Sequence, residues 1–144
     1  MWPDSLTLLE TYGSTYLTFP KVSSIKQLEI EKPCKCSIDV SNENFNSADL
    51  NFANLENLEI LEFFNCPKLR SLPPNAFESA KKLKKLELDE NDNLKVIDKD
   101  ALKGLIELEL IDLSSNRMLN ELPTGFFGNV RNLQEIDISD TKMR

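Results

Sequence analysis

The residues best suited to chemistry in this sequence are carboxylates that recur at regular intervals. Six of them share one position of a repeating apolar pattern: Glu10, Glu29, Glu62, Glu87, Asp112 and Asp137. The last four are spaced 25 residues apart. Carboxylates brought together can act as general acid and base, bind a cation, or attract a basic partner. Which of these functions applies depends on the secondary structure that carries the carboxylates.

Other features of the sequence argue against catalysis. Histidine is absent, which removes the commonest general base and metal ligand. The sequence contains no G-x-G-x-x-G, P-loop, G-x-S-x-G or H-E-x-x-H motif, and no loop with the D-x-[DN]-x-[DN]-G order of a calcium site. We therefore expect no enzymatic activity, no cofactor and no metal site.

The three cysteines also offer little chemistry. A disulfide between Cys34 and Cys36 would be strained, because bridged Cα atoms prefer a separation of about 5.5–6 Å. Two thiols without histidine are too few for a structural zinc site. We interpret Cys34 and Cys36 as exposed thiols in a loop and Cys66 as a buried residue.

The elements that position the carboxylates are predicted by the spacing of apolar residues. Leu83, Leu86 and Leu88 are followed by Asn91, and the same L-x-x-L-x-L-x-x-N/C spacing occurs 25 residues earlier and 25 residues later. A short strand cannot bury such leucines alone, so copies must stack side by side. This predicts a parallel sheet in which Asn91 and Asn116 bond backbone groups where the chain leaves each strand.

This spacing resembles the leucine-rich repeat family. The form L-P-x-x-x-F, which ends at Phe77 and Phe127, resembles the typical animal extracellular class found in Toll-like receptor ectodomains and variable lymphocyte receptors. The resemblance implies an α/β fold, a curved solenoid with a parallel concave sheet and an irregular or short helical convex side. We expect Phe77 and Phe127 to pack under the convex side. The C-x-C pair is similar to the cysteine-rich caps of extracellular members, in which each cysteine pairs elsewhere.

The organisation expected along the chain is a single domain, residues 1–144. It comprises weaker repeats at 1–33, an Asn-, Ser- and Asp-rich insertion at 34–54, regular repeats at 55–132 and a terminal half repeat at 133–144. The first repeat fits two registers, one on Leu9 and one on Leu8. Nothing after Ile138 could cap the core, which predicts either a longer solenoid or end-to-end self-association.

Composition narrows the class of partner. Hydrophobic residues make up 40% and charged residues 28% of the chain, as in ordinary globular proteins. No apolar run approaches the ~20 residues of a membrane span, and the first residues do not resemble a signal peptide. The formal net charge of −7 argues against nucleic acid as a partner.

The outward positions of the predicted strands are acidic, with apolar residues among them. Lys32 and Lys85 are the only basic residues at these positions. Apolar anchors surrounded by charge are typical of protein-binding sites. The residues predicted to bind a partner are Ile60, Glu62, Phe64, Lys85, Glu87, Asp89, Leu110, Asp112 and Asp137.

The leading hypothesis is a recognition module that binds a basic protein or peptide on the concave face. By resemblance, it would belong to an extracellular or cell-surface receptor of innate immunity. One alternative is an intracellular, cytoplasmic inhibitor or scaffold of the ribonuclease-inhibitor kind, favoured by unpaired cysteines and by the lack of any N-x-S/T sequence. A second alternative is a structural spacer, in which the acidic positions serve only solubility.

Overall fold

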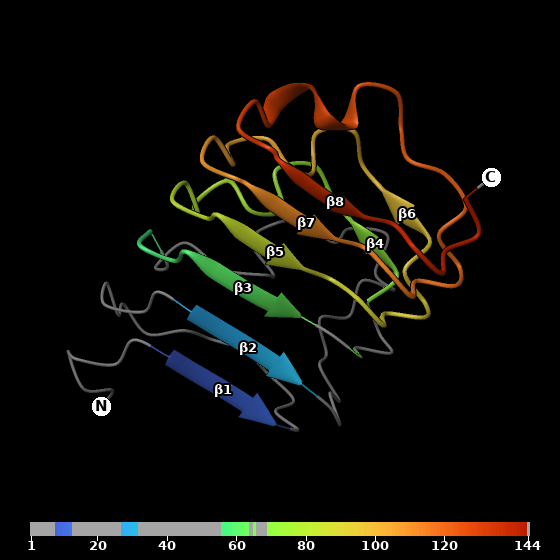
Figure 1. Cartoon of the computed structure of the whole chain (residues 1–144), viewed down its shortest axis with the longest axis horizontal. Helices are drawn as coiled ribbons and strands as arrows, with labels where there is room; N and C mark the ends of the chain where they lie inside the picture. Colours follow the sequence, from blue (N-terminus) through green and yellow to red (C-terminus); the bar gives the residue numbers. More distant parts are fainter. Residues whose placement is uncertain (1–7, 13–26, 32–55, 64, 66–68, 144) are drawn as a thin grey trace.

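The computed structural model describes residues 8–12, 27–31, 56–63, 65 and 69–143. Its main element is a parallel sheet of six strands, shown in Figure 1 in the order β1-β2-β3-β5-β7-β8. The strands are β1 (Leu8–Tyr12), β2 (Gln27–Glu31), β3 (Ile60–Phe63), β5 (Lys85–Glu87), β7 (Leu110–Asp112) and β8 (Glu135–Asp137).

A second sheet lies on the opposite side of the stack (Figure 1). It pairs β4 (Ser71–Leu72) with β6 (Val96–Ile97) in parallel. The 3-10 helix η2 (Phe126–Asn129) follows in the last return segment. The α/β solenoid expected from the sequence is confirmed, with a parallel main sheet and an opposite side of short, irregular elements.

The register of the main sheet follows the buried leucines. Leu61, Leu86 and Ile111 are partners on adjacent strands, and none of the three is exposed to solvent. Leu28 aligns with Leu61 although their spacing is 33 residues, and Leu9 aligns with Leu28. The structure therefore selects the first-repeat register based on Leu9. The insertion expected at 34–54 lies outside the described residues, so the proposed boundaries remain predictions.

The core lies between the two sheets and is continuous along the regular repeats. Each repeat contributes leucines from the strand and further apolar residues from the return segment. In the return segments, Phe77 and Leu102 are buried, as are Ala76 and Ala101. A single strand could bury none of this surface, so the stacking of neighbouring repeats provides the main stabilisation.

The last return segment differs from the sequence-based expectation. Phe126 is buried, whereas Phe127 is only half-buried and packs edge-on against Phe126 with ring centroids 4.9 Å apart. Phe127 therefore packs against the core as expected, but Phe126 is the more deeply buried of the two. Phe126 stands at the position that Ala76 and Ala101 occupy in the two earlier repeats, and all three residues are buried there. The inward-facing position is therefore common to the repeats, and in the last one it holds a large aromatic side chain.

A ladder of asparagine side chains joins successive repeats. Asn91 is fully buried, and its Nδ2 donates to the carbonyls of Phe63 at 2.7 Å, Leu88 at 2.8 Å and Asp89 at 3.1 Å. Asn116 repeats the arrangement and also donates to the carbonyl of Leu88, at 2.9 Å. This confirms the asparagine ladder. Cys66, at the equivalent place, lies outside the described residues.

The residue before each ladder position has a left-handed backbone. Asn65, Glu90, Ser115 and Asp140 all have φ between 53° and 56°. None is glycine, so each accepts a conformation that ordinary side chains rarely adopt. The recurrence of this bend every 25 residues turns the chain off each strand at the same point.

The final strand is far more exposed than its predecessors. Ile136 and Ile138 are 45% and 41% exposed, whereas Ile111 and Leu113, their counterparts one repeat earlier, are fully buried. Whether a further repeat or a second copy covers this surface remains a prediction. In the described part of the chain, no helix has the length and apolar character needed to cross a bilayer.

Replacing Asn91 with alanine should destabilise the stack. The change leaves the carbonyls of Phe63 and Asp89 without the amide donor of Asn91. We expect the free energy of unfolding to fall by about 2–3 kcal/mol, measured by urea denaturation. Asn120→Ala is the matched control, because Asn120 is exposed. Equal effects of the two substitutions would contradict the role assigned to the ladder.

Candidate functional site

The acidic positions form one straight column across the main sheet. Glu10 pairs in register with Glu29, and the pairing continues through the strands to Asp137. We call this set the acidic column; its members are Glu10, Glu29, Glu62, Glu87, Asp112 and Asp137. Neighbouring strands are about 4.8 Å apart, so carboxylates on adjacent strands repel one another. The alignment expected from the repeat is confirmed at the level of strand register.

A second row runs beside the acidic column, two residues earlier on each strand. Lys85 is paired with Ile60 on one side and with Leu110 on the other. All three side chains are half-buried. The row continues to Glu135 on β8, which is exposed. Apolar surface therefore lies directly beside the column, on both sides of a lysine.

Lys85 forms ion pairs within the acidic column. Its Nζ lies 2.8 Å from Oε1 of Glu87 and 3.9 Å from Oε1 of Glu62. The hydrogen bond to Glu87 raises the pKa of Lys85, against an opposing effect of burial. The side chain of Lys85 is 35% exposed and those of Glu62 and Glu87 are 17% and 24% exposed. The two carboxylates thus share one positive charge at the middle of the column.

Partial burial makes two carboxyl groups harder to ionise. Burial raises the pKa of Glu87, and its hydrogen bond with Lys85 offsets part of this effect. Burial also raises the pKa of Asp89, with further contributions from the charges of Asp112, Glu87 and Glu90. Negative charge on this face therefore lowers the stability of the isolated protein. A cationic partner would reduce this loss.

The two aspartates of the column have an additional local role. Oδ1 of Asp112 accepts a hydrogen bond from the backbone N–H of Ser114, and Oδ1 of Asp137 accepts one from Ser139, each at 2.8 Å. The hydrogen bonding with Ser139 lowers the pKa of Asp137. Sequence reasoning missed this function, although an Asp two residues before a Ser at a strand end is a recognised turn signal.

Most of the predicted binding residues come together in the structure. The set on adjacent strands β3, β5 and β7, or directly after β5, comprises Ile60, Glu62, Lys85, Glu87, Asp89, Leu110 and Asp112. Asp137 continues the column on β8 and is exposed. Phe64 lies outside the described residues. Within the described ranges, no group of three or more His, Cys, Asp or Glu residues could hold a metal ion.

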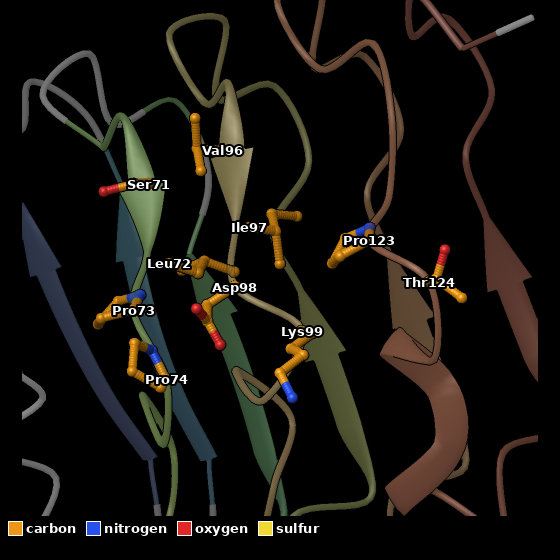
Figure 2. Close-up of a pocket in the computed structure, with 10 residues that line it drawn as sticks. All are labelled: Ser71, Leu72, Pro73, Pro74, Val96, Ile97, Asp98, Lys99, Pro123 and Thr124. Carbon is orange, nitrogen blue, oxygen red and sulfur yellow. The ribbon is translucent and has the colours of Figure 1, made fainter.

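A hollow that the sequence did not indicate lies on the opposite side of the molecule (Figure 2). This groove, of about 530 Å³, runs from β4 across β6 to Pro123 and Thr124. Val96 is 57% exposed there. The Asp98 N–H bonds the carbonyl of Leu72, whereas Pro123 at the equivalent place has no N–H to donate. The proline therefore removes one of the hydrogen bonds that would extend the second sheet past β6.

Comparison with known proteins agrees with this architecture. The family model described as leucine rich repeat matches residues 56–118. Over these residues the chain matches the leucine-rich repeat family. Toll-like receptor 7 of Drosophila melanogaster is 37% identical over 100 residues, which cover 65% of this chain. The aligned region represents only 7% of the length of that receptor. Leucine-rich repeats in general serve protein interactions rather than catalysis.

Neutralising Asp89 and Asp137 should change stability in opposite directions. The raised pKa of Asp89 means that its contribution to stability is complete below its unfolded-state pKa and is lost as the pH rises through the folded-state pKa. Asp89→Asn should therefore raise the Tm at pH 7, and the gain should fade in acid. The pKa of Asp137 is lowered, so its contribution is present above the unfolded-state pKa and is lost as the pH falls through the folded-state pKa.

Asp137→Asn should accordingly lower the Tm at pH 7 and have less effect in acid. Thermal unfolding followed by circular dichroism between about pH 3 and pH 7, a range that spans the ordinary aspartate pKa, measures both changes. A lower Tm for Asp89→Asn at pH 7 would show that the Asp89 carboxylate is stabilising. This would contradict the destabilisation expected from its burial and from the neighbouring negative charges.

Proposed function

We propose that the concave face is a protein-recognition surface for a basic protein or peptide. The observation that carries this proposal is the register of the acidic column, which aligns six acidic residues on six adjacent strands. A row of like charges at this spacing costs free energy in the isolated protein. Cations of a partner would convert that repulsion into attraction.

Apolar side chains next to the column supply the second requirement of a binding site. Ile60 and Leu110 lie in the neighbouring row, and both are half-buried. Such residues contribute affinity when a partner covers them, whereas surrounding charges increase the association rate and orient the partner. A face that served only solubility would need no apolar residues between its charges.

The similarity to a Toll-like receptor supports an extracellular or cell-surface setting for this module. We propose that the chain contributes a ligand-binding segment of a receptor. Its acidic face would then select basic surfaces or segments of the ligand. The Asp89 carboxylate, together with Phe64 on the preceding repeat, would extend the contact beyond the strand ends.

Charge reversal on the column tests this function. The triple variant Glu62→Lys, Glu87→Lys, Asp112→Lys should bind an immobilised arginine-rich peptide at least about tenfold more weakly, because attraction becomes repulsion. Binding by the unaltered protein should also weaken steeply between 50 and 500 mM salt, since exposed charges are screened. Biolayer interferometry would measure both effects.

The control reverses three exposed acidic residues that lie outside the strands. Glu56→Lys, Glu78→Lys, Glu121→Lys changes the net charge by the same amount. Only the column variant should lose binding strongly. Equal losses in the two triple variants would show that net charge, not the concave face, governs binding.

A further inference from the structure

We propose that the ammonium group of Lys85 occupies the place on the recognition surface where a cation of the ligand would bind. The ligand must displace this group in order to bind. This inference rests on the proposed function and specifies how the same face selects its ligand. Lys85 would therefore oppose binding, although it stands in the middle of the contact area. The sequence alone grouped Lys85 with the residues that assist a partner.

The position of Lys85 supports this role. It is the central residue of the row that it shares with Ile60 and Leu110. Its Nζ nevertheless reaches the neighbouring acidic column, where it bonds Glu87 at 2.8 Å and lies 3.9 Å from Glu62. The ammonium group thus occupies the site in which a ligand cation would find two carboxylates, both less than one quarter exposed.

The neighbouring lysine provides a contrast. Lys84 pairs with Glu59 at 3.3 Å, but both residues precede their strands and lie outside the acidic column. The Lys84 side chain is 46% exposed, compared with 35% for Lys85. Removal of either lysine changes the net charge equally. A comparison of the two variants therefore separates the effect of Lys85 at the acidic column from the effect of net charge on binding.

The geometry also indicates the chemistry of the ligand. An arginine can bond a carboxylate with two parallel N–H groups, whereas the ammonium of Lys85 acts as a point charge. An arginine should therefore displace Lys85 more readily than a lysine would. Residues two apart on a strand are about 6.6 Å apart, so an apolar ligand residue at that distance from the arginine could rest on Ile60 and Leu110.

The test compares Lys85→Met with Lys84→Met. Each substitution keeps an unbranched apolar stem and removes one charge. The probes are labelled peptides in which arginine and leucine, or lysine and leucine, lie two residues apart with glycine between them, titrated at 50 mM salt by fluorescence anisotropy. Lys85→Met should bind both peptides about three- to fivefold more tightly, and Lys84→Met should differ from the unaltered protein by less than about twofold. The arginine peptide should bind the unaltered protein more tightly than the lysine peptide, and Lys85→Met should leave this preference unchanged, because either cation displaces the same ammonium group.

A double-variant cycle shows whether Lys85 acts through Glu87. Glu87→Gln removes the closer of the two carboxylates that Lys85 neutralises, so Lys85→Met should give a smaller gain in affinity in this background than in the unaltered protein. Equal affinities for Lys85→Met and Lys84→Met would overturn the inference, as would weaker binding by Lys85→Met. A gain of the same size with Gln at position 87 would also overturn it.

Failure of the proposed function would look different. If no form of the protein, including the unaltered one, bound either peptide in a salt-sensitive way, the recognition surface itself would be wrong and the role of Lys85 would fall with it. Thermal unfolding of each variant confirms that differences in binding do not arise from loss of fold.

Discussion

The constraint on which this structure depends is the alignment of buried leucines between repeats. Leu61, Leu86 and Ile111 are excluded from water only because each lies beside its counterpart on the next strand. Side chains alternate between the two faces of a strand, so the residue after each buried leucine is held in register as well. The packing that stabilises the core therefore also aligns carboxylates on the opposite face.

Repulsion between the aligned carboxylates is reduced by two kinds of local interaction. Lys85 places one positive charge between Glu62 and Glu87 in the middle of the column. Asp112 and Asp137 direct a carboxylate oxygen to the backbone N–H two residues later. Stability and recognition are thus linked, because the groups that reduce repulsion also determine how much negative charge a partner meets.

The sequence was sufficient for features that repeat and insufficient for features that depend on one side chain. The repeated apolar spacing, with a period of 25 residues from β3 onward, predicted the strands, the asparagine ladder and the acidic register, because backbone geometry fixes all three. It could not predict that Lys85 turns toward Glu87, since a lysine stem has several rotamers of similar energy. Phe126 is buried more deeply than Phe127 because it stands at the inward-facing position of Ala76 and Ala101, and the spacing of leucines alone does not reveal that position.

The central claim is that ligands meet the concave sheet, and the most direct measurement is an NMR titration of ¹⁵N-labelled protein with an arginine-rich peptide at low salt. We predict that chemical-shift changes will concentrate on the amides of β3, β5 and β7. Changes concentrated instead around the groove from Ser71 to Lys99, or spread evenly over the surface, would contradict the assignment of the recognition surface to the acidic column.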